Sequence, residues 1–235
     1  MNKKFIIVRL QGGKNMKVIY QAQKFYPEKL THIYAPPAKL YVLGNEDILD
    51  KPAIAIIGCR QASSYGKKVA YEFAYQLAKK GIIIISGLAR GIDAYSHWGV
   101  IKARGKAIAV LGSGLNNVYP KENIKLYKEI IKNGGAVITE YEPNSKPDRM
   151  HFPARNRIIS ALSDGILVVE ARRKSGTLIT VDFGLEHGKD IFCIPGNITS
   201  DNSYSTNELI KQGAIPVTCV DDILENLKYK NVDKL

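Results

Sequence analysis

The sequence has few cysteines, and none of them lies at a metal-binding spacing. Three occur among 235 residues: Cys59, Cys193 and Cys219. A disulfide framework needs an even and closely spaced set, and a zinc site needs Cys-x-x-Cys or a Cys/His cluster. The sequence therefore predicts neither a disulfide scaffold nor a metal site. Widely separated, unpaired cysteines are typical of a reducing compartment, and we expect a cytoplasmic protein.

Long hydrophobic runs are also missing. No segment approaches the roughly 20 apolar residues of a transmembrane helix, and the apolar run at residues 5–8 is too short for a signal peptide. We therefore expect a soluble protein that makes no membrane insertion.

Acidic residues are scarce relative to basic ones. The chain has 34 Lys and Arg against 22 Asp and Glu, which gives a formal net charge of +12. Such an excess produces a positive field that attracts polyanions. Nucleic acid is the first candidate partner and an anionic membrane surface is the second, while a generally basic proteome would explain the charge without any partner. The 45% hydrophobic content is typical of a globular protein.

Regular secondary-structure patterns begin near residue 53, whereas residues 1–50 read as irregular. Short apolar runs then alternate with segments of helical periodicity. This alternation predicts an α/β fold, a Rossmann-like doubly wound, mostly parallel sheet with helices on both faces. The expected strands cover residues 53–57, 82–85, 107–111, 136–139, 166–169 and 191–194, and the expected helices cover 65–80, 93–103, 122–133, 154–162 and 177–187.

Glycine-rich turns follow several of these strands, at residues 58, 87–91, 112–114 and 175–176. Ligands of doubly wound sheets bind outside the carboxyl ends of the strands, near the switch in strand order. Backbone amides and helix N-termini there suit phosphate groups. The common nucleotide motifs are absent: there is no GxxxxGK[ST], and residues 112–117 have Asn117 where GxGxxG needs its third glycine.

The ordered set of motifs resembles the DprA/Smf family. The resemblance runs from about Tyr26 to Leu224 in chain order. It is carried by residues 58–60 with 65–66, by 86–93 with His97, by 109–115 with Tyr119-Pro120, by 152–159, by 168–171 with 175–180, by Pro195-Gly196 and by 207–214.

The resemblance implies an extended Rossmann domain over residues 25–228 that binds single-stranded DNA without any cofactor. In such proteins the domain protects incoming DNA during natural transformation of competent cells and loads the RecA recombinase onto the strand. Members also pair as homodimers. Residues 1–24 match nothing in this pattern, and residues 229–235 form a C-terminal tail.

The sequence departs from the family pattern in two respects. The usual Gly-Ser-Arg turn reads Gly58-Cys59-Arg60, so a thiol replaces a hydroxyl that could bond a phosphate. Either the backbone amide of Cys59 binds the phosphate or that contact is weaker. We also expect no room for the N-terminal helical domain and C-terminal winged helix that many members carry.

Basic, glycine and hydroxyl residues at the expected strand ends are the candidate phosphate contacts. Arg60 could instead cap a carbonyl, Phe152 could stack a base or pack its helix onto the sheet, and Asp93 is interpreted as a helix N-cap. His97 is interpreted as a packing residue with satisfied hydrogen bonds. The predicted site comprises Gly58, Cys59, Arg60, Ser86, Gly87, Arg90, Gly91, Lys146, Arg149, Phe152, Arg155, Asn156, Arg157, Ser175, Gly176 and Thr177.

An enzyme of the same superfamily is the main rival function. Nucleotide phosphoribohydrolases of the LOG type carry PGGxGTxxE, and aligning Gly176-Thr177 with its GT leaves Thr180 at the position of the catalytic glutamate. Acid–base catalysis needs a carboxyl at the reacting centre, and Glu170 and Glu186 are off that spacing. We therefore expect no catalytic residue and no enzyme activity, while a nucleotide-binding sensor remains a further alternative.

Overall fold

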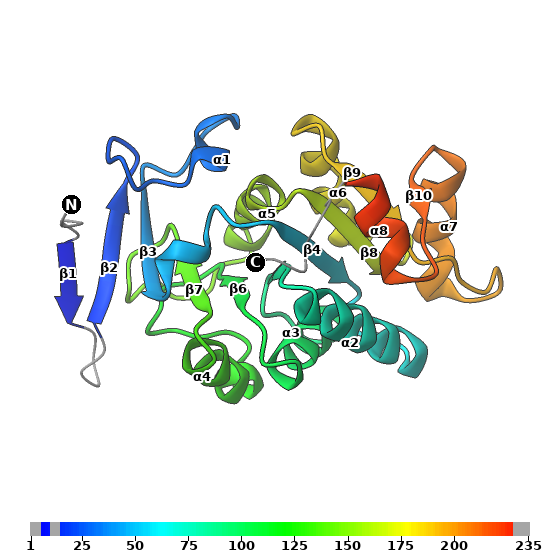
Figure 1. The fold of residues 1–235 in the computed structure, drawn as a ribbon, viewed down its shortest axis with the longest axis horizontal. Coiled ribbons are helices and arrows are strands. Elements are labelled where there is room, and N and C mark those ends of the chain that lie inside the picture. The colour runs from blue at the N-terminus through cyan, green and yellow to red at the C-terminus, as the bar shows by residue number, and fades with distance from the viewer. Residues whose placement is uncertain (1–5, 10–14, 228–235) are drawn as a thin grey trace.

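The computed structural model describes residues 6–9 and 15–227, the side chains of 6–9 excepted (Figure 1). The strands are β1 (Ile6–Arg9), β2 (Asn15–Tyr20), β3 (Lys39–Gly44), β4 (Ala53–Gly58), β5 (Ile83–Ser86), β6 (Ala107–Val110), β7 (Ala136–Thr139), β8 (Gly165–Glu170), β9 (Asp190–Cys193) and β10 (Ile215–Pro216). The α-helices are α1 (Glu28–Thr31), α2 (Ser64–Lys79), α3 (Ile92–Lys102), α4 (Ile124–Lys132), α5 (His151–Leu162), α6 (Thr177–Glu186), α7 (Tyr204–Lys211) and α8 (Val220–Asn226), and three short 3-10 turns cover Glu46–Ile48, Lys121–Asn123 and Asp201–Ser203.

The described strands form one sheet in the order β1-β2-β3-β7-β6-β5-β4-β8-β9-β10. Neighbouring strands from β7 to β10 are parallel, and β1, β2 and β3 are antiparallel to their neighbours. The chain builds outward from β4 to β7 and then returns to add β8 on the other side of β4. The prediction of a doubly wound, mostly parallel sheet is therefore confirmed, and the switch in strand order lies between β4 and β8.

Alternate residues of each central strand pack into two separate cores. Ile54 and Ile56 of β4 belong to a cluster with α2, α3, α4 and α8, whereas Ala55 and Ile57 belong to a cluster with α1, α5 and α6. This follows from the two-residue period of a strand. Figure 1 shows α2, α3 and α4 on one side of the sheet and α5 and α6 on the other.

The expectation of irregular structure over residues 1–50 is wrong, because this region contains β1, β2, β3 and the short helix α1. Residues 15–20 and 39–44 form β2 and β3, and β3 pairs with β7, so that Val42 lies opposite Ile138. This pairing joins segments almost 100 residues apart, which local periodicity does not reveal. The tail at 229–235 lies outside the described residues.

Most predicted elements agree with the observed ones to within one or two residues, and α5 is an exception. It begins at His151 rather than 154, because Pro153 falls within its first turn, where no intrahelical N–H is required. Helices α7 and α8 and strand β10 extend the domain beyond the predicted elements.

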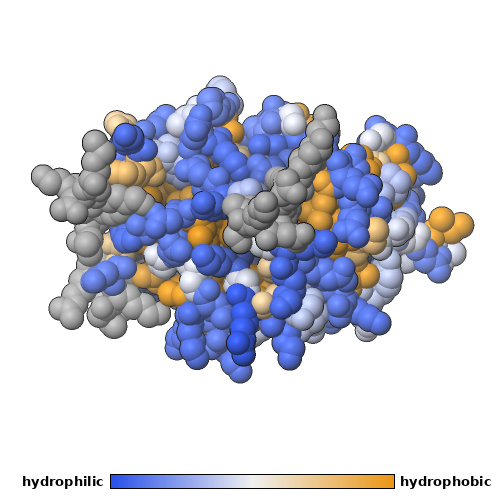
Figure 2. Space-filling model, in the orientation of Figure 1, coloured by the Kyte–Doolittle hydropathy of each residue, from blue (hydrophilic) through white to orange (hydrophobic). Residues whose placement is uncertain are grey.

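Hydrophilic residues cover most of the face shown in Figure 2, with small apolar areas between them. Among the described residues, no helix is both long and apolar enough to cross a membrane.

Candidate nucleic-acid interface

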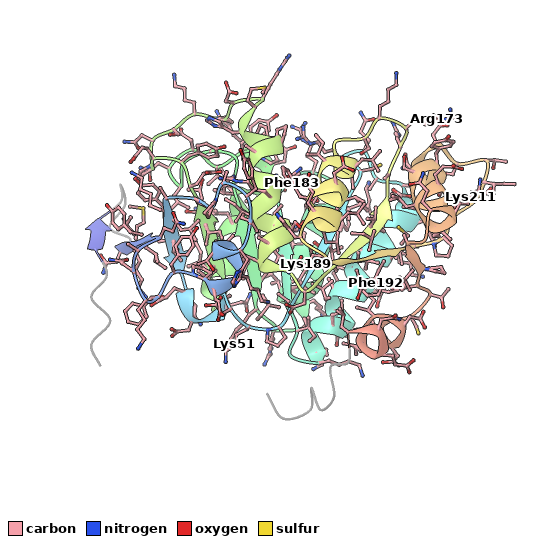
Figure 3. All side chains as sticks on the ribbon, turned by 90° about the horizontal axis from the view of Figure 1, so that it is seen from above. Lys51, Arg173, Phe183, Lys189, Phe192 and Lys211 are labelled. Atoms are coloured by element: carbon pink, nitrogen blue, oxygen red, sulfur yellow. The ribbon has the colours of Figure 1, made fainter. Side chains whose placement is uncertain are left out.

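A cleft of about 800 Å³ opens at the carboxyl ends of the parallel strands. The turns after β4, β5, β6 and β8 and the start of α5 surround it, so it lies at the predicted switch point. Figure 3 shows the two ends of the parallel strands. Arg173 lies beyond the carboxyl end of β8, whereas Lys51, just before β4, lies at the opposite, amino end. The residues around the cleft include Gly58, Cys59, Arg60, Gln61, Ala89, Arg90, Asp93, Tyr119, Arg149, Phe152, Arg155, Asn156, Arg172, Arg173, Lys174, Ser175, Gly176 and Thr177.

A buried carboxylate joins the two strands of the switch point. Glu170, at the end of β8, accepts hydrogen bonds from the backbone N of Ser63 at 2.9 Å, from the Ser63 hydroxyl, and from Asn202 Nδ2 at 3.0 Å. Ser63 in turn caps α2, since its Oγ accepts from the backbone N of Gly66 at 3.0 Å. Glu170 therefore holds the turn after β4.

The turn after β5 is held from within by Asp93. Its Oδ2 accepts from the backbone N of Gly87 at 3.0 Å and of Ala89 at 3.3 Å. The expectation that Asp93 is the N-cap of its helix is wrong, because Gly91 occupies that position and Asp93 bonds amides of the preceding loop. A Cβ on Gly91, whose φ is +71°, would lie 2.2 Å from the carbonyl oxygen of Cys59, so the two turns pack directly together.

Arg155 lies beneath the same turn and is only 4% exposed. Its Nη1 donates to the carbonyl of Gly87 at 2.8 Å and also to the carbonyl of Val110, which ends β6. Burial lowers the pKa of Arg155 to about 10, with the nearby carboxylate of Asp93 opposing the shift, so the side chain stays charged at neutral pH. Arg155 thus supports two turns of the cleft and places a fixed positive charge under them.

His97 lies in the interior beside this charge. It is fully buried, and neither ring nitrogen has a hydrogen-bond partner within the described part of the protein. Burial, reinforced by the charge of Arg155, lowers the pKa of His97 to about 3. The interpretation of His97 as a packing residue is consistent with this burial, but the expected hydrogen bonds are absent, so it packs as a neutral ring.

An aromatic pair lies opposite the turn after β4. The ring of Phe152 is 5.6 Å from the ring of Tyr119, and the Arg60 guanidinium lies over Phe152 at 5.4 Å from its centroid. A Cβ on Gly112 would lie 2.7 Å from Phe152 Cδ1, so the glycine makes space for this ring. Tyr119 is 41% exposed. Phe152 therefore packs on the turn after β6 and also lines the cleft, and its stacking on a base stays a prediction.

The loop after β8 provides the third side of the cleft. Arg172 donates to Asn202 Oδ1 at 2.5 Å and to Gln61 Oε1 at 3.1 Å, which links this loop to the turn after β4. The Arg173 guanidinium lies over the ring of Tyr204 at 3.7 Å. Exposed charges are thus held by neighbouring groups rather than spread into solvent.

Ser175 and Thr177 shape the start of α6. The Thr177 backbone N and the Ser175 hydroxyl are both bonded within the turn: the N donates to Ser175 Oγ at 3.2 Å, and that hydroxyl donates to Thr177 Oγ1 at 2.9 Å. Gly176 between them is exposed, and a Cβ placed on it would meet no atom within 4 Å. The backbone at Gly176 is therefore open to a ligand.

The backbone amide of Cys59, which was one of the two alternatives for binding a phosphate, is already hydrogen-bonded within the protein. The backbone N of Cys59 donates to the carbonyl of Glu170 at 2.9 Å, and its side chain is 5% exposed. Burial raises the pKa of the Cys59 thiol. Of the two alternatives, the structure therefore favours a weaker contact at this position.

Most of the predicted site residues come together, and a few do not. Gly87 lines a small cavity that adjoins the cleft, and Gly91 lines a second groove that meets the cleft at Arg60, Gln61 and Arg90. The Ser86 hydroxyl donates to the carbonyl of Ile56 in the interior, and Lys146 is exposed outside the cleft lining. Arg157 forms a two-bond ion pair with Glu140, at 2.6 and 2.7 Å, so it anchors its helix rather than the cleft.

The charge around the cleft is strongly positive. Its lining holds six arginines and Lys174, and Asp93 is the one acidic residue among the described lining residues. Arg90 pairs with Glu122, whereas Arg60 and Arg149 are exposed and form no ion pair among the described residues. Walls of one charge sign concentrate the field inside a cleft. The site is built to receive an anion.

Gln61 and Asn202 are site residues that sequence reasoning missed. Both bond Arg172, and Asn202 also donates to Gln61 O at 3.2 Å and to Glu170. No local motif marks them, because their role depends on contacts across 141 residues. Proximity of Gln61 to the Gly58-Cys59-Arg60 turn is the one signal that could have suggested it.

Glu170 and Glu186, the carboxylates considered for a hydrolase, do not line the cleft. Glu170 is 2% exposed and its oxygens accept from Ser63 and Asn202. Glu186 is exposed at the end of α6, and Thr180, at the position of the hydrolase glutamate, is 3% exposed. Among the described residues, no group of three or more His, Cys, Asp or Glu could hold a metal ion.

Comparisons with known proteins agree with the motif resemblance. DNA processing protein DprA of Bacillus subtilis is 41% identical over 212 residues, which cover 90% of this chain and 71% of that protein. Protein Smf of Escherichia coli is 41% identical over 215 residues, 92% of this chain and 58% of its own length. The chain therefore spans little more than half of that longer relative.

Solved structures of DNA processing protein A have the same fold. The Streptococcus pneumoniae protein superposes with a TM-score of 0.83 at 39% identity, covering 88% of this chain and 73% of that one. The Helicobacter pylori protein, described for its unique single-stranded DNA binding mode, gives 0.81 at 30% identity and covers 91% of this chain and 96% of that one. The model of the family DNA recombination-mediator protein A matches residues 17–228. The chain belongs to this family, the DprA/Smf family.

Proposed function

We propose that the cleft binds single-stranded DNA. The observation that carries the proposal is the stack of Arg60 over Phe152 with Tyr119 beside it, at the mouth of a positively charged cleft. A guanidinium can fork onto a phosphate, and an aromatic face can stack an unpaired base. The single-stranded DNA binding of the Helicobacter pylori relative supports the same ligand.

The phosphates would contact the three sides of the cleft. Arg60 and Arg149 are exposed and form no ion pair among the described residues, and the open backbone at Gly176 lets a phosphate approach the start of α6. Arg155 contributes charge from below while its Nη1 stays bonded to the turns above it. In this proposal some predicted site residues contact the phosphates, and others, such as Arg155, hold the turns that form the cleft.

A single strand fits this chemistry better than a duplex does. In a duplex the bases are paired and stacked on one another, so their faces are not available to Phe152 and Tyr119. Stacking accepts every base, so we expect little sequence preference. Phosphate contacts with arginine release counterions, so we expect the affinity to fall steeply with salt.

Fluorescence anisotropy of labelled oligo-dT against a matched duplex, at several salt concentrations, tests the proposal. Arg60→Ala and Arg149→Ala should each weaken single-strand binding and reduce the salt slope by about 0.7. Arg104→Ala is the matched control, because Arg104 is exposed after α3 at the opposite edge of the sheet. If both DNAs bind equally and the two cleft variants bind them as the parent protein does, the binding comes from the overall positive charge, and the proposal is contradicted.

A role in recombination and the formation of a homodimer are suggested by the family rather than by the geometry of the cleft. We propose that the bound strand is passed to a RecA-type recombinase and that two copies of the chain pair as a homodimer, in line with the recombination-mediator family. RecA-dependent strand exchange with and without the protein tests the first, and light scattering of the purified protein tests the second. An unchanged exchange rate or a monomeric mass would refute the respective part.

The proposal includes no chemistry on the strand. Asp93 is the one carboxyl of the described cleft lining, and its Oδ2 accepts from two backbone amides. Burial raises the pKa of Asp93. Incubation with nucleoside monophosphates should release no free base, and measurable release that Asp93→Asn abolishes would instead support a hydrolase.

A further inference from the structure

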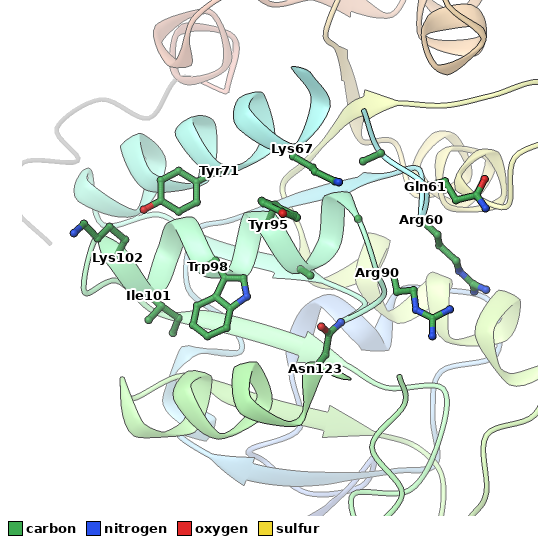
Figure 4. Close-up of a pocket in the computed structure, with 13 residues that line it drawn as sticks. Arg60, Gln61, Lys67, Tyr71, Arg90, Tyr95, Trp98, Ile101, Lys102 and Asn123 are labelled. Carbon is green, nitrogen blue, oxygen red and sulfur yellow. The ribbon is translucent and has the colours of Figure 1, made fainter. Parts of the chain in front are cut away.

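A second groove, of about 740 Å³, opens on the outer side of α2 and α3. It shares Arg60, Gln61 and Arg90 with the cleft, so the two hollows are continuous around these residues. Figure 4 shows Arg60 and Arg90 at one end of the groove and Lys102 at the other. A chain that leaves the cleft past Arg60 would therefore enter this groove.

Aromatic side chains line the groove between its two basic ends. Tyr95 and Trp98 of α3 lie with Tyr71 of α2 between Arg90 and Lys102 (Figure 4). Tyr95, Trp98 and Lys102 are spaced i, i+3 and i+7, which puts them on one face of the helix. Tyr95 is 39% exposed, and Trp98 and Tyr71 are partly exposed.

The close packing of the two helices makes one surface of these side chains. A Cβ on Gly99 of α3 would lie 2.3 Å from the carbonyl oxygen of Tyr71, so only glycine permits this approach. Gly99 lies beside Trp98 in the chain. The aromatic row is therefore a product of the helix contact rather than of either helix alone.

The groove is basic as well as aromatic. Lys67 Nζ lies 5.6 Å from the ring centroid of Tyr95, and Lys102 is exposed. No acidic residue occurs among the described residues that line it. Arg90 is paired with Glu122, whereas Lys67 and Lys102 form no ion pair among the described residues. Rings that alternate with such cations match a polyanion that carries flat apolar groups.

We propose that this groove binds the bases of the single strand that continues out of the cleft. Tyr95 and Trp98 stack the bases, and Lys67 and Lys102 neutralise the phosphates beside them. The inference rests on the proposed function, because the strand must first occupy the cleft. It extends the binding surface from the carboxyl edge of the sheet onto the outer surface of α2 and α3.

Trp98 gives a direct reading, because it is the single tryptophan of the chain. The experiment compares oligo-dT of about 5 nucleotides with oligo-dT of about 20 nucleotides, bracketing common single-strand site sizes. Binding of the long strand should quench Trp98 fluorescence, since a base stacks on the indole. The short strand should bind in the cleft, in a manner that depends on Arg60, and leave the fluorescence unchanged.

Variants separate stacking from charge. Tyr95→Ala should weaken the long strand about 5-fold or more and the short strand hardly at all. Tyr34→Ala, at a tyrosine 92% exposed outside both hollows, is the matched control. Lys67→Ala should also weaken the long strand, whereas Lys68→Ala, at the exposed neighbour that does not line the groove, should not. When the outer half of the long strand lacks its bases, Tyr95→Ala should leave the affinity for that strand unchanged.

The outcomes distinguish the two proposals. If the short strand fails to bind, the proposed function itself fails. If it binds through Arg60 but the long strand neither quenches Trp98 nor responds to Tyr95→Ala, the groove inference alone is overturned. If Tyr95→Ala weakens the short and the long strand equally, the first nucleotides bind in the groove, and the proposed path from the cleft into the groove is overturned. Loss of self-association in Tyr95→Ala with unchanged DNA affinity would assign the groove to a second copy of the chain instead.

Discussion

The carboxylate of Glu170 accepts hydrogen bonds from both the backbone N and the hydroxyl of Ser63, 107 residues earlier in the chain. This contact joins the end of β8 to the start of α2 across the switch point. Gly66 is required beside it, because a Cβ there would lie 2.4 Å from Glu170 Oε2. The carboxylate is thus a structural link between two sides of the cleft.

Glu170→Gln should lower the free energy of unfolding by about 1 to 3 kcal/mol, since bonds to a buried charged acceptor are replaced by weaker ones. Urea denaturation measures the change. Glu186→Gln, at the exposed glutamate of α6, should change it by less than about 0.5 kcal/mol. Equal stability of the two variants would refute the structural role of Glu170.

Arg155→Ala should destabilise the protein strongly, by about 3 to 5 kcal/mol, because it leaves Asp93 buried without its cationic neighbour. Arg60→Ala, at an exposed residue, should leave the free energy of unfolding unchanged while DNA affinity falls. Urea denaturation and anisotropy on the same preparations test the contrast. If Arg155→Ala is as stable as the parent protein, the guanidinium is a ligand contact rather than a support.

Gly176→Ala should fold normally yet bind DNA less well. The backbone φ of Gly176 is −59° and its Cβ position is empty, so alanine is accommodated in the free protein. The added methyl group would meet a phosphate that approaches the start of α6. Thermal unfolding should show equal or slightly higher stability, and anisotropy should show weaker binding of oligo-dT. Unchanged affinity would remove Gly176 from the interface.

Acid should destabilise the protein through His97. Its folded pKa, about 3, lies below the ordinary value of 6.5, so the unfolded chain binds the proton more readily. Stability is therefore unaffected above about pH 6.5 and falls as the pH drops toward 3, by about 2 kcal/mol at pH 5. The measurement is urea denaturation at about pH 7 and about pH 5.

His97→Leu is the control for this pH dependence. The ring has no hydrogen-bond partner among the described residues, so a leucine of similar volume should cost less than about 1.5 kcal/mol at neutral pH. The variant should lose part of the difference between the two pH values. If parent and variant lose the same stability at low pH, His97 is not the responsible group.

The sequence alone determined the class of the fold and the end of the parallel strands at which the candidate site lies. The apolar runs at residues 53–57 and 166–169 and the helical period between them are local patterns, and they become β4 and β8 of a parallel sheet. Glycine turns after those strands then point to the carboxyl edge. Such inferences work because periodicity and turn chemistry act over a few residues.

Tertiary structure alone decided which of the predicted side chains line the cleft and which support the fold. Arg155 and Arg157 are near neighbours in one basic segment, yet one is buried under two turns and the other pairs with Glu140. The addition of β2 and β3 to the sheet, and the meeting of Tyr71 with Trp98 in one groove, likewise depend on contacts between distant segments. Packing between distant segments sets these environments, and no local pattern encodes them.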